Sequence, residues 1–322
     1  MLKPQPGGPP PEALLDYAIS LAATNEPVTR LCLIPTAVGD RQDVIDHFAG
    51  LFAGRDDVDF SSLRLFTQPN VPDVRAHLLA QDVLLVCGGS VVNLVAVWQA
   101  HGLPEILREC WEAGVVLAGW SAGSLCWHVG GPTDSYRDNL DPFAGGLAFL
   151  PYSNGVHDDL DDQPRRAVFR ELVANGTLPA GYATEDGTGL LYAGTELLEA
   201  VTILPGRHAW HVTPEGGGHY AERAIVPRLI TAGEAGHGSP AVRSRHESRG
   251  GQRLAGLQDE EHEAQEAGLA PLPEGVTSSC WRPECFSINV AVFRIWPQLR
   301  GGIRPHGECH RFGLRGGVAG PV

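Results

Sequence analysis

The chain has 322 residues, of which 43% are hydrophobic and 19% charged, a mixture typical of globular proteins that excludes a wholly disordered or fibrous chain. The formal net charge is −14, and because acidic and basic residues balance in residues 231–322, the acidic excess lies entirely in residues 1–230. Such an acidic body disfavours nucleic acid as a partner, since contacts with phosphate need Lys and Arg.

The first fifteen residues, MLKPQPGGPPPEALL, lack the apolar stretch and small-residue cleavage site of a secretory signal. The longest apolar runs, such as Val83–Cys87, are too short to cross the hydrocarbon core of a bilayer. Seven cysteines, an odd number without paired spacing, fit a reducing compartment better than a disulfide framework. These features predict a cytoplasmic protein without a membrane partner.

From residue 12 to residue 119 the pattern of apolar residues alternates between helical spacing and short continuous runs. This alternation predicts a parallel sheet covered by helices on both faces, the doubly wound class of α/β fold. The predicted helices are Glu12–Ala23, Val44–Phe52, Val74–Ala80, Val91–Gln99 and Pro104–Ala113, and the predicted strands are Val28–Pro35, Ser62–Phe66, Val83–Cys87 and Val115–Gly119.

The two ends of the chain depart from this pattern. A doubly wound sheet normally opens with a strand, whereas the first predicted element here is a helix, and this order would be explained by a first strand that is missing from the sequence. Residues 231–322 are rich in Gly, Pro and Arg and largely without periodicity, which predicts a low-order tail after a folded domain of residues 1–230. Within the tail, only Ile288–Trp296 has the pattern of a strand.

Ser121 is the main candidate for a catalytic residue. The buried strand that ends at Gly119 runs into Gly-Trp-Ser-Ala-Gly and then into a predicted helix. This strand–turn–helix context is that of a nucleophile elbow, in which a sharp turn exposes the serine hydroxyl at a helix N-terminus. The alternative is that the glycines mark an ordinary tight turn.

A nucleophilic serine needs a base and an acid that orients it. His157 follows a glycine in a polar loop, although an ordinary solvated histidine would fit that position as well. Glu185 and Asp186 come at the end of a short predicted strand, before a glycine, and Asp-Gly is also a common turn sequence. One of these two acids is the candidate orienting carboxylate.

Four segments in order resemble peptidase E of the S51 serine peptidases, over about residues 12–230: LCLIPTAVGD, DVLLVCGGSVVNLVAVWQAHGL, GVVLAGWSAGSLCW and the loop around His157. Cyanophycinase and the class I glutamine amidotransferases resemble the chain more distantly. The resemblance implies a flavodoxin-like or class I glutamine amidotransferase-like α/β fold, and a hydrolase with Ser121 as nucleophile and His157 as general base. Asp186 matches the acid position best, with Glu185 the alternative. A homodimer is also implied.

The resemblance implies an oxyanion hole as well. The glycine-rich loop that lies beside the nucleophile in the family is here Cys87-Gly88-Gly89-Ser90-Val91. The amide of Gly89, or of Gly88, together with that of Ala122 is expected to bind the developing oxyanion. Ser90 stands where the family has Asn. We therefore do not expect this chain to make the substrate contact that the Asn side chain would make.

Two further groups of residues have side chains suited to binding a substrate or a metal. Arg165 and Arg166 are candidates for binding an acidic group of the substrate, with a place on a helix surface as the alternative. The cysteines and histidines near the C-terminus lack the spacing of a metal site, so no metal is predicted; they are Cys280, Cys285, His306, Cys309 and His310.

The sequence therefore predicts a serine peptidase that hydrolyses short peptides, such as dipeptides with an N-terminal Asp, through an acyl-enzyme and without a cofactor. Two alternatives stay open at this point. One is an isopeptidase or amidase related to cyanophycinase, and the other is a homologue that has lost activity.

Overall fold

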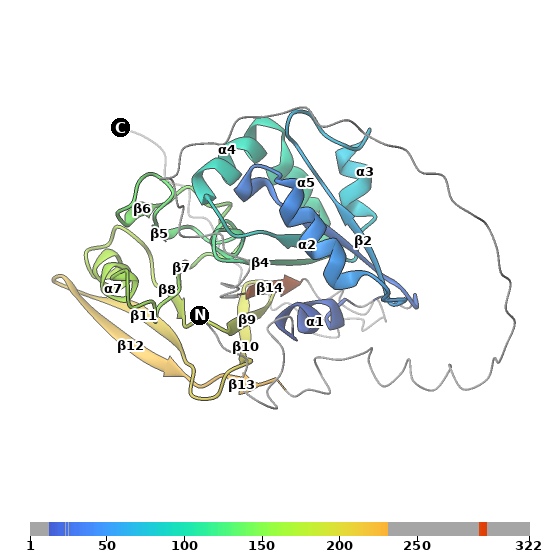
Figure 1. The fold of residues 1–322 in the computed structure, drawn as a ribbon. Helices are drawn as coiled ribbons and strands as arrows, with labels where there is room; N and C mark the ends of the chain where they lie inside the picture. Colours follow the sequence, from blue (N-terminus) through green and yellow to red (C-terminus); the bar gives the residue numbers. More distant parts are fainter. Residues whose placement is uncertain (1–12, 23, 25, 231–289, 295–322) are drawn as a thin grey trace, which may run out of the picture.

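The computed structural model describes residues 13–22, 24, 26–230 and 290–294, and its centre is an eight-stranded sheet (Figure 1). The strand order is β13-β10-β9-β14-β4-β3-β1-β2. Strands β2, β1, β3 and β4 run parallel to one another, whereas β14 is antiparallel to β4 and parallel to β9. Their bounds are β1 Thr29–Ile34, β2 Val58–Ser62, β3 Val83–Val86, β4 Val116–Trp120, β9 Thr188–Ala193, β10 Glu196–Thr202, β13 Arg228–Leu229 and β14 Val290–Arg294.

Helices cover both faces of this sheet because side chains of successive strand residues point to opposite faces. Cys32, Ile34 and Val86 pack against helices α3, α4 and α5, whereas Leu31 and Leu33 pack against α1 and α2. In Figure 1, α3, α4 and α5 lie above strand β4, and α1 lies below it. The bounds are α1 Ala13–Ser20, η1 Thr36–Val38, α2 Gln42–Phe52, α3 Val74–Leu79, α4 Val91–Ala100 and α5 Leu103–Glu112. The predicted α/β class, with a mostly parallel sheet, is confirmed.

A second sheet of four strands, which the sequence pattern did not predict, stands beside the first in the order β12-β11-β8-β7 (Figure 1, left). Strands β7 and β8 are parallel, and helix α7 packs on this sheet through Phe169 and Val173. Two short strands, β5 and β6, form a separate pair. The bounds are β5 Gly131–Thr133, β6 Asp141–Phe143, β7 Ser153–Val156, α7 Arg165–Ala174, β8 Gly181–Thr184, β11 Ala209–Gly216 and β12 His219–Ile225, and a short helix, α6, spans Ala122–Leu125.

The strand predicted at Ser62–Phe66 is misplaced, because β2 ends at Ser62. The alternation of Leu63 and Leu65 favoured a strand, and both side chains are indeed buried in the core. After Leu63, whose N–H still donates to the Leu33 carbonyl at 2.9 Å, the backbone leaves the sheet: the Asp40 carboxylate accepts the N–H groups of Leu65 and Phe66 in place of a strand partner. Burial of the Leu65 side chain therefore does not require a ladder hydrogen bond.

Five residues of the predicted low-order tail form part of the central sheet. Val290–Arg294 make up strand β14, which lies between β4 and β9 and coincides with the one segment of the tail that has the pattern of a strand. The rest of residues 231–322, and any strand before Ala13, lie outside the described residues. The domain boundary at residue 230 stays a prediction.

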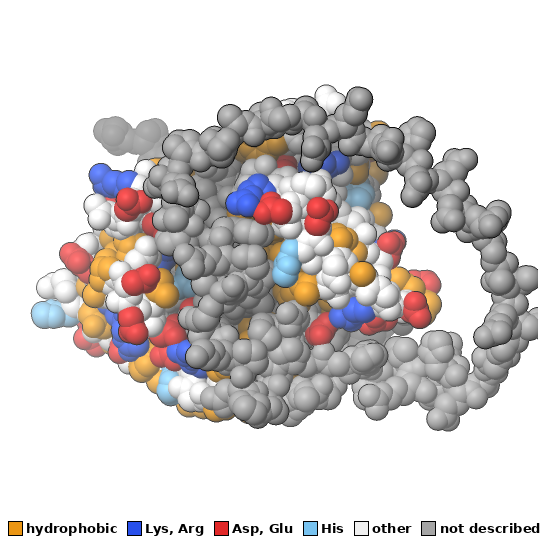
Figure 2. Space-filling view, in the orientation of Figure 1, with side chains coloured by type: hydrophobic (Ala, Val, Ile, Leu, Met, Phe, Trp, Pro, Cys, Tyr) orange, Lys and Arg blue, Asp and Glu red, His pale blue; other side chains and the backbone are white. Residues whose placement is uncertain are grey.

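The surface in view carries charges of both signs, with arginines close to carboxylates (Figure 2). Ion pairs of this kind include Arg41–Asp43 and Arg30–Asp82. A nucleic-acid surface instead gathers Lys and Arg into a continuous stripe. Within the described part of the chain, none of the helices has the length and apolar character needed to cross a membrane.

Candidate active site

Ser121 lies between strand β4 and helix α6, at the carboxyl end of the strand. Its φ of 52° is a left-handed value that costs a non-glycine residue about 1–3 kcal/mol. Two glycines allow the turn: a Cβ on Gly119 would lie 2.2 Å from the carbonyl oxygen of Gly123, and a Cβ on Gly123 would lie 2.2 Å from that of Val86. The G-x-S-x-G sequence is therefore a steric requirement of this strand–turn–helix unit.

The second sheet brings a histidine and a carboxylate to the same serine. Strands β7 and β8 pair with Val156 opposite Thr184, so His157, one residue past β7, comes close to Asp186, two residues past β8. His157 Nδ1 lies 2.7 Å from Asp186 Oδ1, and Nε2 lies 3.0 Å from Ser121 Oγ. In the tautomer with its proton on Nδ1, the imidazole donates to the carboxylate and accepts from the serine hydroxyl. These groups form one chain of hydrogen bonds.

The nucleophile and the base are held in sparsely populated conformations, and the base and the acid are largely shielded from water. His157, like Ser121, has a positive φ, of 59°. The side chains of His157 and Asp186 are 14% and 9% exposed. Strained residues persist only where the surrounding structure determines them, and they gather at functional sites.

The neighbouring acids have other partners. Glu185 Oε2 accepts the backbone N–H of His208 at 2.9 Å, and the Glu185 N–H donates to the His208 carbonyl at 3.2 Å, so this residue joins β8 to the chain before β11. Asp158 is buried in an ion pair with Arg170. Of the two acids predicted from the sequence, Asp186 is the one that the structure places on the imidazole.

Asp159 supports the backbone of Asp186. Its Oδ1 accepts the Asp186 N–H at 2.7 Å, and its Oδ2 pairs with the Arg207 guanidinium. Sequence reasoning did not assign Asp159 this role, because a hydrogen bond to the backbone of a residue 27 positions away leaves no local pattern. The contact fixes the residue that carries the carboxylate without touching the imidazole.

Asn154 links the two sheets beneath the site. Its Nδ2 donates to Ser124 Oγ at 2.9 Å, and both residues are buried. Asn154 belongs to β7, which ends just before His157, and Ser124 belongs to α6, which begins just after Ser121. This buried hydrogen bond therefore fixes the strand of the base against the helix of the nucleophile. No sequence motif distinguishes Asn154 from an ordinary strand residue.

The glycine-rich loop lies against the nucleophile, as the resemblance implies. A Cβ on Gly88 would lie 3.1 Å from Ser121 Cβ, and Gly89 has a φ of 133°. Ala122 is the first residue of α6, where backbone N–H groups have no partner within the helix. Ser90, in place of the family Asn, caps helix α4 by accepting the N–H of Asn93 at 3.2 Å.

The two predicted substrate-binding arginines have carboxylate partners in the chain itself. Arg165 is 7% exposed and pairs with Asp134 at 3.0 Å. Arg166 pairs with Asp158 and Glu222, at 3.3 and 3.4 Å. These contacts attach helix α7 to its surroundings, and the expected substrate contact of either arginine stays a prediction.

The cysteines near the site are inert. Cys87 and Cys126 are fully buried and free, and burial raises the pKa of each thiol well above its usual value. A neutral thiol is a poor nucleophile, because the thiolate is the reactive form. Ser121 is therefore the better placed nucleophile.

Comparisons with known proteins found peptidases to which the chain is similar. The sequence profile of peptidase family S51 matches residues 11–200. The uncharacterized peptidase YgaJ of Bacillus subtilis (strain 168) is 37% identical over 202 residues, which are 62% of this chain and 84% of that protein. A peptidase from an acI-B1 Actinobacterium has a similar fold, with a TM-score of 0.50 at 16% identity, over 68% of this chain and 89% of that one. A putative peptidase E protein from Listeria monocytogenes EGD-e matches 66% of this chain and 93% of its own, with a TM-score of 0.38 at 14% identity.

Proposed function

The chain belongs to peptidase family S51, and from this membership we propose that it is a serine peptidase whose catalytic residues are Ser121, His157 and Asp186. The observation that supports the proposal is the chain of hydrogen bonds from Asp186 Oδ1 through the imidazole to Ser121 Oγ. That order of groups is the one that activates a serine hydroxyl.

The geometry supports an acyl-enzyme mechanism. Ser121 Oγ attacks the scissile carbonyl carbon while His157 Nε2 accepts the hydroxyl proton. His157 then gives that proton to the leaving amine, and a water molecule, activated by the same nitrogen, hydrolyses the acyl-enzyme. Asp186 holds the imidazole in the tautomer that leaves Nε2 unprotonated and stabilises the imidazolium.

The oxyanion of each tetrahedral intermediate would be bound by backbone amides. Ala122 offers its N–H at the start of α6, where the helix dipole also favours negative charge. Gly88 or Gly89 offers the second donor, because the loop lies so close to Ser121 that a Cβ on Gly88 would be 3.1 Å from Ser121 Cβ. Such donors act on the transition state when they lie about 3 Å from the developing oxyanion.

The proposed substrates are short peptides, including dipeptides with an N-terminal Asp. We also propose a cytoplasmic location, supported by the four free buried thiols among the described residues; these are Cys32, Cys87, Cys110 and Cys126.

The proposal is tested by labelling the full chain with a fluorophosphonate and locating the adduct by mass spectrometry, beside hydrolysis of a dipeptide panel. Wild type is expected to carry the label on Ser121 and to hydrolyse members of the panel, and Ser121→Ala is expected to do neither. Ser20→Ala is the matched control, since it removes an exposed hydroxyl on helix α1 and should leave the labelling intact. Labelling that persists in Ser121→Ala would contradict the proposed nucleophile.

A further inference from the structure

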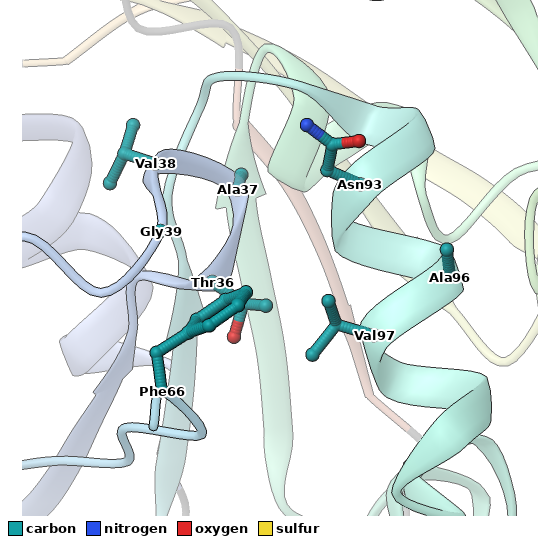
Figure 3. Close-up of a pocket in the computed structure, with 8 residues that line it drawn as sticks. All are labelled: Thr36, Ala37, Val38, Gly39, Phe66, Asn93, Ala96 and Val97. Atoms are coloured by element: carbon teal, nitrogen blue, oxygen red, sulfur yellow. The ribbon is translucent and has the colours of Figure 1, made fainter. Parts of the chain in front are cut away.

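A pocket of about 440 Å³ lies between the chain that follows β1 and helix α4 (Figure 3). It belongs to the same edge of the sheet as the nucleophile, because η1 follows β1, α4 follows β3 and Ser121 follows β4, and these three strands are parallel. Open α/β sheets bind their ligands at the carboxyl ends of the strands. The eight lining residues are Thr36, Ala37, Val38, Gly39, Phe66, Asn93, Ala96 and Val97.

Two consecutive glycines connect the pocket to the nucleophile. Gly89 presses against the pocket wall, since a Cβ there would lie 2.4 Å from the Ala37 carbonyl oxygen and 2.9 Å from Val38 Cγ1. Gly88 presses against Ser121 on the other side. Strand β3 alone separates β1 from β4, so the strand that leads into the pocket lies about 10 Å from the strand that carries Ser121.

The lining of the pocket defines what it can bind. None of the eight lining side chains is charged, and most are apolar. Phe66 forms one wall although its side chain is large and 48% exposed, and Asp40 holds it in place by accepting the Phe66 N–H at 2.9 Å. A charged group would lose its hydration in this pocket without gaining an ionic partner, whereas an apolar side chain would gain from burial.

The hydroxyl of Thr36 does not make this lining polar. The residue is 1% exposed, and its hydroxyl has no hydrogen-bond partner within the described part of the chain. In Figure 3 the hydroxyl oxygen lies between Phe66 and Val97. This oxygen is buried, so Thr36 presents no polar atom that would favour a charged ligand over an apolar one.

We propose that this pocket is the subsite that selects the substrate, and that it binds the uncharged, apolar side chain of one of the two residues flanking the scissile bond. The inference rests on the proposed function, because it supplies a side-chain pocket to the site of Ser121. Phe66, Ala96 and Val97 provide the apolar walls.

The test measures kcat/KM for two dipeptide series, Asp-Xaa and Xaa-Ala, in which Xaa is Ala, Leu, Met, Asp or Lys. In one of the two series, wild type is expected to prefer Leu and Met over Asp and Lys. Ala96→Phe fills the pocket from helix α4, and should lower kcat/KM for Leu and Met at least about tenfold more than for Ala. Ala100→Phe is the matched control, the same change one helical turn away at an exposed position outside the pocket, and should leave that ratio unchanged.

A second variant changes the chemistry of the pocket instead of its volume. Asn93→Arg places a positive charge in the lining from an exposed position, and should raise kcat/KM for Xaa Asp relative to Leu at least about tenfold. A Leu-to-Ala ratio in Ala96→Phe equal to that of wild type would overturn the subsite while leaving the peptidase intact. Failure of wild type to hydrolyse any member of either series, or hydrolysis that survives Ser121→Ala, would overturn both proposals.

Discussion

The nucleophile and the pair that activates it come from regions built in different ways. Ser121 is positioned by one continuous segment, in which β4, two close-packed glycines and α6 fix the turn locally. His157 and Asp186 are positioned by the parallel pairing of β7 with β8, which brings together residues 29 positions apart. The geometry of the first region depends on residues adjacent in the sequence, whereas that of the second depends on the correct pairing of two strands. Substitutions can therefore damage the two regions separately.

Removal of the nucleophile should have the largest effect. Ser121→Ala is expected to lower kcat at least about a thousandfold and to leave the thermal unfolding midpoint close to wild type, because the turn is held by its glycines. The double variant Ser121→Ala with His157→Ala should lose little more, since these groups act as a unit. More than a tenth of wild-type turnover in the single variant would place the nucleophile elsewhere.

The second region is tested at its acid. Asp186→Asn removes the charge that holds the imidazole tautomer, and is expected to lower kcat at least about a hundredfold with KM nearly unchanged. Glu185→Gln is the matched control, since its carboxylate accepts from the His208 backbone instead, and turnover should stay within about tenfold of wild type. The reverse ranking of the two variants would transfer the role to Glu185.

The hydrogen bond between the two regions is the next target. Asn154→Ala removes the amide that donates to Ser124 Oγ, and should lower kcat about tenfold because small displacements of a base are costly. It should also reduce the free energy of unfolding by about 1–3 kcal/mol, since a buried polar group loses its partner. Asn175→Ala, at the exposed end of α7, serves as control. Wild-type kcat in Asn154→Ala would show that the sheets hold their places without this bond.

The last prediction concerns stability alone and leaves turnover unchanged. Burial lowers the pKa of His128 to about 4. The hydrogen bond that its Nδ1–H donates to the Ser124 carbonyl acts in the opposite direction and raises the pKa, but its effect is smaller. Because the unfolded chain protonates this histidine first, stability is complete above about pH 6.5, and falls by ~3 kcal/mol as pH decreases to about 4.

Denaturant unfolding of His128→Asn between pH 7 and pH 4 measures this contribution. The variant keeps an N–H donor but does not titrate, so its stability should depend less on pH than that of wild type. His101→Asn, an exposed position, is the control and should follow wild type. Equal pH dependence in wild type and His128→Asn would assign the acid sensitivity to other groups.

The two regions also differ in how well the sequence predicts them. The parallel half of the sheet and the elbow at Ser121 were predictable, because apolar runs, glycines and helical spacing are local patterns. The position of His157 was predictable only through the family resemblance. The sequence of strand β7 is SNGV, in which Val156 is the single aliphatic residue apart from the glycine. All four residues are buried, so the strand lacks the alternation of apolar and polar residues by which a half-buried strand is predicted.

The choice of Asp186 over Glu185 came from the family resemblance and not from any local pattern. Glu185 and Asp186 are adjacent, and no local pattern reports which of them faces the imidazole. The direction is set by long-range contacts, those of Glu185 with His208 and of Asp186 with Asp159. The pocket was equally hidden, because its lining comes from segments that meet only after β1 and β3 have paired.

The position of strand β14 makes folding depend on the timing of synthesis. It pairs with β4, the strand that carries Ser121, across about 170 residues of chain, which a ribosome adds in on the order of 10–35 s. During that interval β4 lacks one neighbour and exposes an open edge, the kind of surface on which nascent chains aggregate. The yield of active enzyme therefore depends on how quickly the stretch between Leu229 and Val290 is translated, and slow codons there would demand more protection from chaperones than slow codons anywhere before Ser121.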